Sequence, residues 1–337
     1  MNKQLLYTIA AMMALLAVFA ACKRESVVYV AGAEYKSRRN SVIGICKNGT
    51  AQDLTDGKSR AWASSIFVSG TDVYVAGTEE DELKNVVPTV WKNGAAQRLS
   101  SRNAHTSVSS IYVSGADVYA VGNEQASIEK PSVAVLWKNG DSQNLSDGVD
   151  NAIASSVFVS GDGVYVAGYE CNAQGIQVAI LWKNGRAMSL SNGKEHAMAM
   201  SVFVSGKDVY VAGIDGGTPT LWKNGEAKGL RGIQYVSSVF VSGNDVYVAG
   251  WGYEHYSKLD LMLRVAKLWK NGVVQNLCDG DHESSAESVF VAGDDVYVAG
   301  MERNLRKTNT AILWKNGEAQ SLSDGSRDAA AESVFVL

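Results

Sequence analysis

The sequence predicts an all-β fold, a seven-bladed β-propeller in which each blade is a sheet of four antiparallel strands. A first repeated motif, of the type Val-Tyr-Val-Ala-Gly, ends at Gly32, Gly77, Gly122, Gly168, Gly213, Gly250 and Gly300. A second, of the type Trp-Lys-Asn-Gly, ends at Gly49, Gly94, Gly140, Gly185, Gly225, Gly272 and Gly317. Units of about 45 residues with four short strands are typical of propeller blades.

The unit around Ser238–Gly250 shows how its four strands, A to D, arise. Strand A is of the type Ser-Val-Phe-Val, and a tight Ser-Gly-x-Asp turn leads to strand B, Val-Tyr-Val-Ala. Strand C ends in Leu-Trp, and strand D follows the Lys-Asn-Gly turn. Asn-Gly favours the turn type whose twist matches that of paired strands. The unit therefore predicts a four-stranded meander.

The two ends of the chain complete one blade. Val27–Gly32 reads as a B strand without its A strand, and Glu332–Leu337 as an A strand without its B strand. Pairing of these segments closes a ring and removes the open sheet edges. A linear solenoid would need polar caps instead.

Residues that recur in every unit are interpreted first as structural. Tryptophan recurs in strand C, where we expect it to fill the wedge between blades, as Trp91, Trp137, Trp182, Trp222, Trp269 and Trp314. Cys46 replaces it in the first unit. Aspartates of the A–B turn are expected to bond the turn backbone; they are Asp72, Asp117, Asp208, Asp245 and Asp295. Serines that open strand A should ring the central channel; they are Ser65, Ser110, Ser156, Ser201, Ser238, Ser288 and Ser333.

The N-terminus has the pattern of a secretion signal. An apolar run from Leu5 to Ala21 follows Lys3 and stops at Cys22. The segment Phe19-Ala-Ala-Cys22 resembles the bacterial lipoprotein box, with Phe where Leu is usual. We therefore expect a signal peptide over residues 1–21, lipidation of Cys22 and one propeller domain over residues 22–337. An ordinary cleaved signal beside a chance cysteine is the alternative.

The composition limits the classes of partner and ligand that are expected. The formal net charge is −4 and there is no basic tract, so nucleic acid is not expected. Cys46, Cys171 and Cys278 show no disulfide or zinc-ligand spacing and are expected as free thiols. No motif indicates a cofactor, a metal or a catalytic group, so none is expected, and a monomer is expected.

The repeats resemble those of uncharacterised bacterial propeller lipoproteins that carry tandem Val-Tyr-Val-Ala-Gly and Leu-Trp-Lys-Asn-Gly units. The resemblance covers nearly all of residues 22–337. It implies a propeller on a lipid anchor, outside the cytoplasm in the bacterial cell envelope. It implies nothing about a ligand, because a fold does not supply a function.

A binding surface is expected where the units differ. The A–B and C–D turns are short and uniform, whereas the B–C and D–A loops, on the opposite face, vary in length. Aromatic residues outside the repeat gather in those loops: Tyr35, Trp62, Tyr169, Tyr235, Trp251, Tyr253 and Tyr256. All four histidines lie there too: His105, His196, His255 and His282.

Two functions follow from these loops, and a contribution to an envelope assembly without a specific ligand is a third possibility. The first is a membrane-anchored binding or scaffold protein that recognises a protein, peptide or glycan through the loop face. The second is a hydrolase or lyase, with His105, His196 and His282 converging above the channel, where three imidazoles would suit zinc. Because the chain enters strand B shortly after Cys22, the lipid would hold the turn face near the membrane and present the loop face outward.

Overall fold

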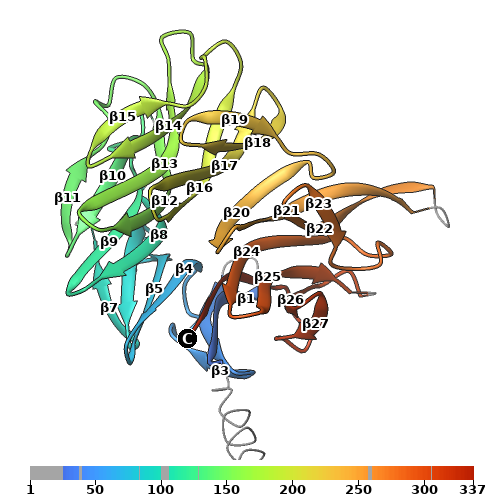
Figure 1. Ribbon diagram of the computed structural model, residues 1–337. Helices are drawn as coiled ribbons and strands as arrows, with labels where there is room; N and C mark the ends of the chain where they lie inside the picture. Colours follow the sequence, from blue (N-terminus) through green and yellow to red (C-terminus); the bar gives the residue numbers. More distant parts are fainter. Residues whose placement is uncertain are drawn as a thin grey trace, which may run out of the picture.

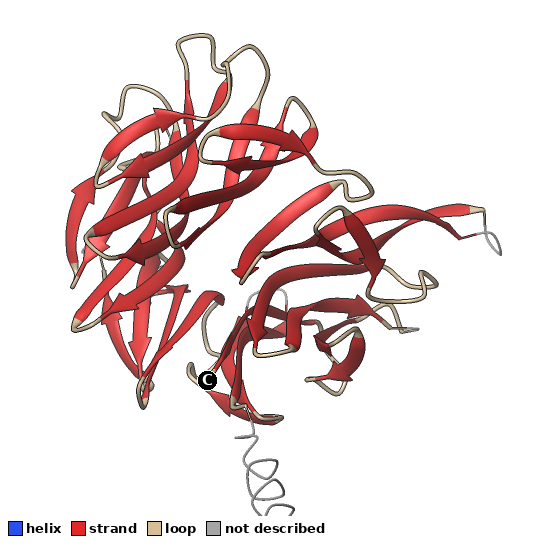
Figure 2. Ribbon diagram, in the orientation of Figure 1, coloured by secondary structure: helices blue, strands red, loops and turns tan. Residues whose placement is uncertain are grey.

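The computed structural model describes residues 26–37, 40–82, 84–99, 106–127, 129–256, 260–304 and 306–337. They form seven four-stranded antiparallel sheets arranged radially about one axis (Figure 1). The described residues contain no helix (Figure 2). The predicted seven-bladed propeller is confirmed.

Each blade runs from an inner strand at the axis to a short outer strand at the rim. The A strands are β4 (Ala61–Ser69), β8 (Ser107–Ser114), β12 (Ala152–Ser160), β16 (Ala197–Ser205), β20 (Tyr235–Ser242), β24 (Ser284–Ala292) and β28 (Ala329–Val336). The B strands are β1 (Val28–Ser37), β5 (Asp72–Glu80), β9 (Asp117–Glu124), β13 (Gly163–Cys171), β17 (Asp208–Asp215), β21 (Asp245–Tyr256) and β25 (Asp295–Arg303). The C strands are β2 (Asn40–Lys47), β6 (Val86–Lys92), β10 (Val133–Lys138), β14 (Gln177–Lys183), β18 (Thr218–Lys223), β22 (Leu261–Lys270) and β26 (Asn309–Lys315). The D strands are β3 (Thr50–Asp53), β7 (Ala95–Arg98), β11 (Asp141–Asn144), β15 (Arg186–Ser189), β19 (Glu226–Gly229), β23 (Val273–Asn276) and β27 (Glu318–Ser321).

One blade is built from both ends of the chain. Its sheet has the order β28-β1-β2-β3, so the last strand of the chain is its inner strand. Val28 pairs with Val336 and Tyr29 with Phe335, and the backbones of Val27 and Leu337 bond each other in both directions. The predicted closure by the terminal strands is therefore confirmed, and this blade is called the closing blade below.

The strand C tryptophans fill the wedges between blades, as expected. Each of the six is at most 4% exposed and packs into the hydrophobic cluster shared with the preceding blade. Trp91, for example, lies among Tyr29, Ala31 and Ile43 of the closing blade. Burial of an aromatic side chain this large is a main source of stability for such interfaces.

A β-bulge interrupts the A–B pairing in every blade, which the sequence did not predict. In the β4–β5 pair the register shifts between Ala63 and Ser65, leaving Ser64 as the extra residue. The equivalent extra residues are Ser109, Ser155, Met200, Ser237, Glu287 and Glu332. Opposite the bulge, a Cβ on Gly77 would lie 2.2 Å from the Trp62 carbonyl oxygen, so only glycine fits.

The serine after each bulge joins its blade to the next. The N–H of Ile66 in β4 donates to Ser333 Oγ of β28 at 3.2 Å, and the N–H of Val334 donates to Ser288 Oγ at 3.2 Å. The same bond of 3.1–3.3 Å occurs at the remaining five interfaces. The expected serine ring exists, and its members are hydrogen-bond acceptors between blades.

Seven aromatic side chains form a second closed ring. Each lies on an inner strand, two residues after the linking serine. The members, each tilted by 47–53° to the next with centroids 4.7–5.0 Å apart, are Phe67, Tyr112, Phe158, Phe203, Phe240, Phe290 and Phe335. This spacing and tilt are favourable for aromatic pairs. The two rings hold the blades together at the axis.

The repeated aspartates connect the two turns of a blade. Asp72 accepts hydrogen bonds from Asn93 Nδ2 and Lys92 Nζ, both at 2.8 Å, and the Asn93 Oδ1 accepts the N–H of Val73. The same pattern recurs at the other four aspartates. At Asp72, Asp117, Asp208 and Asp245, the expectation that the aspartate bonds the A–B turn backbone was wrong, because Asn and Lys side chains at the C–D turn donate to it.

The serine ring predicts different effects on stability for substitutions of two adjacent serines, Ser155 and Ser156. Ser156→Ala removes the acceptor of the Val202 N–H, and leaving a buried donor unpaired costs about 1–3 kcal/mol. Ser155→Ala is the matched control, because its side chain bonds none of the residues that the structure describes. Urea unfolding should show a loss of free energy for the first variant alone. Equal losses for both would contradict a linking role for Ser156.

Candidate recognition face

The B–C and D–A loops lie on one face of the ring, called the loop face, and its largest feature is the β21–β22 hairpin. These strands have 12 and 10 residues, against 6–10 for their counterparts in other blades. The hairpin projects beyond its blade (Figure 1). Pairing continues to Tyr256 and Leu261, so the projection is an ordered two-stranded arm.

Aromatic side chains line this arm where it leaves the blade. The rings of Tyr235 on β20 and Trp251 on β21 stack at 5.2 Å and 12°. Tyr253 meets the edge of Trp251 at 5.5 Å and 76°. Arg264 of β22 lies over the Trp251 ring at 5.8 Å. Three of the aromatic side chains that the sequence analysis selected, Tyr235, Trp251 and Tyr253, thus form one contiguous group with Arg264, which it did not select.

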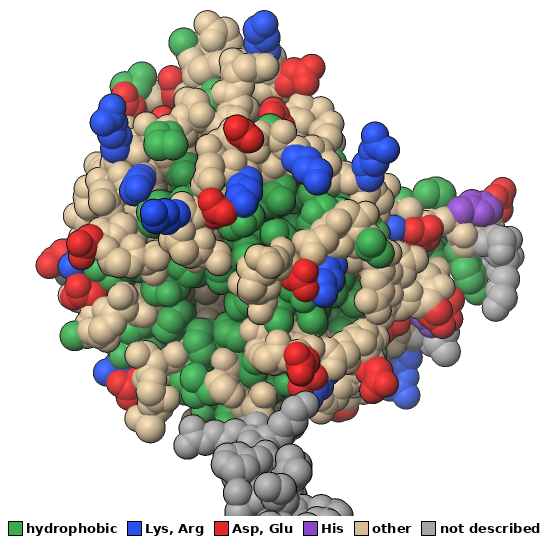
Figure 3. Space-filling view, in the orientation of Figure 1, with side chains coloured by type: hydrophobic (Ala, Val, Ile, Leu, Met, Phe, Trp, Pro, Cys, Tyr) green, Lys and Arg blue, Asp and Glu red, His purple; other side chains and the backbone are tan. Residues whose placement is uncertain are grey.

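The outer part of the arm exposes apolar surface. Tyr253 is 47% exposed, Leu261 49% and Met262 59%. In space-filling view, hydrophobic side chains show on the projection, and more show between the blades around the centre of the face in view (Figure 3). Charged groups of both signs are scattered among them. Exposed Tyr and Met beside an arginine are typical of protein-binding surfaces.

The other predicted aromatic residues lie in separate places. The Arg60 guanidinium covers Trp62 at 4.8 Å. Tyr35 is half-buried: burial raises its pKa, the nearby Glu332 raises it further and Arg60 opposes both. Burial also raises the pKa of Tyr169, against a hydrogen bond from Gln177. Tyr256 ends β21, opposite Leu261. Tyr35, Trp62 and Tyr169 thus pack the loop face away from the arm's cluster, whereas Tyr256 lies on the arm itself.

The described histidines each have a local partner. His196 Nδ1 accepts the N–H of Gln177 at 3.2 Å, and His255 Nε2 lies 2.7 Å from Asp260 Oδ1. His282 Nδ1 lies 2.5 Å from Asp281 Oδ1. Among the described residues one group could hold a metal ion, Asp281, His282 and Glu302, and His196 and His255 are not part of it. His105 lies outside the described residues, as does Cys22.

The Glu302 group stands beside a pocket of about 250 Å³. Burial raises the pKa of Glu302, and the nearby His282 opposes this shift. Glu302 occupies a position at which glutamate recurs. The strand register places Glu34, Glu79, Glu124 and Glu170 at the same point of their blades. In the closing blade, Arg327 pairs with Glu34 at 2.9 Å. The carboxylate at this position therefore has a basic side chain beside it in these two blades, His282 at Glu302 and Arg327 at Glu34.

The sequence analysis did not identify two glutamates that lie at bulges. Glu287 of β24 and Glu332 of β28 occupy equivalent positions on adjacent inner strands, where four blades carry serine and one methionine. Burial, and then the charge of Glu287, raise the pKa of Glu332 to about 7. Burial also raises the pKa of Tyr235, and the charge of Glu287 raises it further. Alignment of the seven units at the serine would have shown these substitutions.

Comparison with known proteins shows the fold. No protein-family model matches the chain, and no curated protein matches its sequence. Among solved structures, it is similar to a Mycobacterium tuberculosis puromycin-hydrolyzing peptidase (TM-score 0.58, 11% identity, 89% of this chain and 52% of that one). It is also similar to the Pyrococcus horikoshii acylaminoacyl peptidase (0.53, 15%, 90% and 52%).

A third structure is matched along almost its whole length. The β-propeller domain of the Trilobed protease from Pyrococcus furiosus has a TM-score of 0.54 at 13% identity, over 90% of this chain and 96% of the domain. The chain spans about half the length of the two peptidases. At 11–15% identity, these likenesses show a β-propeller and do not transfer an activity.

Glu332 predicts a pH dependence of stability. Its folded pKa, about 7, is above the unfolded value of about 4.3, so the carboxyl contributes no penalty below about pH 4.3 and destabilises the fold progressively up to about pH 7. Glu332→Gln should therefore stabilise the protein at pH 8 by about 1–3 kcal/mol and leave it nearly unchanged at pH 4.5. Urea unfolding at both pH values tests this, with the exposed Glu226→Gln as control. A gain that is independent of pH would contradict it.

Proposed function

We propose that this protein is a membrane-anchored, extracytoplasmic recognition module that binds a peptide or protein segment through its loop face. The observation that carries the proposal is the aromatic cluster of Tyr235, Trp251 and Tyr253 on the projecting arm. A rigid scaffold that presents one long hairpin with exposed apolar side chains on its strands is suited to binding a partner.

The geometry favours a peptide or protein over a glycan. Sugar rings bind by stacking on an open aromatic face, but neighbouring side chains from β20 and β22 already cover Trp251. What remains accessible is Tyr253 together with the aliphatic Leu261 and Met262. Such flexible and aromatic side chains fit the apolar side chains of a polypeptide partner.

Binding is also better supported than hydrolysis or lyase chemistry. A catalytic base must reach its partner groups in one site. His196 and His282 are held by residues of their own regions, Gln177 and Asp281, and their strands β16 and β24 are separated by the β20 blade.

Lipid anchoring at Cys22 belongs to the proposal. The N–H of Val28, at the start of β1, donates to Asn48 Oδ1 of a C–D turn, so the described chain begins at the turn face. An anchor attached shortly before this point would hold the turn face toward the membrane and direct the arm away from it. No helix of the described residues is long and apolar enough to cross a membrane.

The recognition proposal predicts a loss of peptide binding. Peptides selected from a displayed random library against the full chain should bind Tyr253→Ala about tenfold or more weakly, as expected for an exposed aromatic anchor. The control is Val273→Ala, which removes a side chain that is 72% exposed on β23. Titration calorimetry with matched melting curves separates binding from folding. Selection of no peptide, or equal weakening by both variants, would contradict the proposal.

Anchoring predicts a change in phase behaviour. The full chain expressed in bacteria should incorporate labelled fatty acid and enter the detergent phase of a Triton X-114 extract, since acylation supplies the apolar anchor. Cys22→Ser should do neither, whereas Cys171→Ser should behave as the parent chain. Detergent partition of the Cys22→Ser protein would refute anchoring through this residue.

A further inference from the structure

The closing blade lacks two side chains that the other blades use to fill the wedge before them. Cys46 of β2 stands where the other C strands carry tryptophan. Two residues earlier, Gly44 stands at a position that is larger elsewhere: Thr89, Val135, Ile180, Thr220, Lys267 and Ile312. Both positions face the preceding blade, because alternate residues of a strand share one side.

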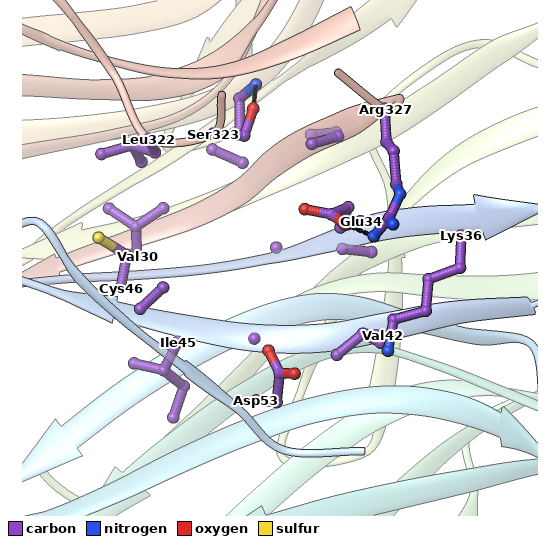
Figure 4. Close-up of a pocket in the computed structure, with 18 residues that line it drawn as sticks. Val30, Glu34, Lys36, Val42, Ile45, Cys46, Asp53, Leu322, Ser323 and Arg327 are labelled. Atoms are coloured by element: carbon purple, nitrogen blue, oxygen red, sulfur yellow. Dashed lines mark hydrogen bonds and ion pairs between the residues drawn. The ribbon is translucent and has the colours of Figure 1, made fainter. Parts of the chain in front are cut away.

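A pocket of about 360 Å³ occupies this wedge (Figure 4). Val30 and Cys46 line one side and Leu322 and Ser323 of the preceding blade the other. Gly32 and Gly44, which pair with each other, leave the middle of its floor without side chains. Its volume lies within the range of about 300–1,000 Å³ of small-molecule sites.

The backbone does not require glycine at position 44. A Cβ there would meet its nearest atom, the Gln52 carbonyl oxygen, at an ordinary 3.4 Å, and the residue is not in the left-handed region. Gly32 differs, because a Cβ would collide with the Ala330 carbonyl oxygen at 2.2 Å, as at every bulge. The open floor therefore comes from this chain's own residues and not from strain in the strand.

The other blades show which shape fits the space. Each places an indole there, and a ring carbon of Trp182 lies against Gly168, as one of Trp314 does against Gly300. Gly32 is the equivalent glycine of the closing blade by register. The indoles of Trp182 and Trp314 are fully buried. The molecule thus contains six templates of the group that its seventh wedge lacks.

The pocket has an apolar end and a charged end. Glu34 and Arg327 form an ion pair of 2.9 Å at one end, near Lys36, while Cys46 and Leu322 lie at the other (Figure 4). A ring with a polar substituent would enter with the ring toward Cys46 and the substituent toward the ion pair. Removal of apolar ring surface from water favours this orientation.

We propose that this wedge is a binding site for a small molecule with a flat aromatic group of about the size of an indole. The site is separate from the aromatic arm of β21 and β22, and stands whether or not that arm binds peptides. Small apolar cavities in proteins do take up aromatic molecules of matching size.

Indole itself is the probe, and the three thiols report where it binds. Burial raises the pKa of Cys46, so alkylation by iodoacetamide is followed at pH 9 in the full chain by mass spectrometry of each cysteine. At about ten times the dissociation constant, bound indole should slow alkylation of Cys46 about tenfold and leave Cys171 and Cys278 unchanged. Unchanged alkylation of Cys46, or equal slowing at all three, would overturn the proposal.

Filled variants provide the second test. Gly44→Ile with Cys46→Trp places Ile and Trp at the two wedge-facing positions, as in β14 and β26, and should raise Tm and abolish the Tm increase given by indole. Gly44→Val, which adds only a small side chain, covers the case in which the double variant does not fold. Cys278→Ser is the control and should keep the indole response. A filled variant that still responds as the parent chain would overturn the assignment, and so would no response of the parent.

Discussion

The hydrogen bond from each inner strand to the serine of the preceding blade is the interaction on which the ring depends. An inner strand has one edge without a partner strand, and its backbone donors must be satisfied where the blades converge. Ser201 Oγ does this for Val239, and six equivalent serines do it around the axis. The preceding bulge sets the register of that serine. The glycine opposite the bulge leaves room for a backbone carbonyl of the bulged strand. Bulge, glycine and serine therefore act as one device.

The repeats made most of the fold predictable, because each unit had to bury the same alternating positions against its neighbours. Strand order, the Asn-Gly turns, closure by β28 and β1, and the wedge tryptophans all follow from spacing. The bulge did not, since one extra residue in a short strand leaves the alternation of Ser65, Phe67 and Ser69 intact. The partners of Asp72 were also missed, because they come from another turn of the blade.

The candidate site was less predictable, for a physical reason. Repetition places a residue in a blade and on a face, but loop side chains depend on local partners. Trp251 and Tyr253 were chosen by composition, yet their contact depends on Tyr235 and Arg264 in neighbouring strands. Glu287 and Glu332 have no unusual local sequence; they become visible only as departures from serine at one repeated position. In a repeat protein, such departures carry the information about function.

The inner strands at the axis hold the ring together, whereas the outer strands vary from blade to blade. The interface between the closing blade and its predecessor has an unfilled wedge at Cys46, yet its serine bond from Val334 to Ser288 has the ordinary length of 3.2 Å. Its aromatic pair, Phe290 and Phe335, is at 5.0 Å, close to the 4.7–4.9 Å of the others. Because the inner strands already hold the blades, outer positions can lose a tryptophan without opening the ring. The extended arm also belongs to strands outside the inner ring, so the closed axis permits both an emptied wedge and a projecting hairpin.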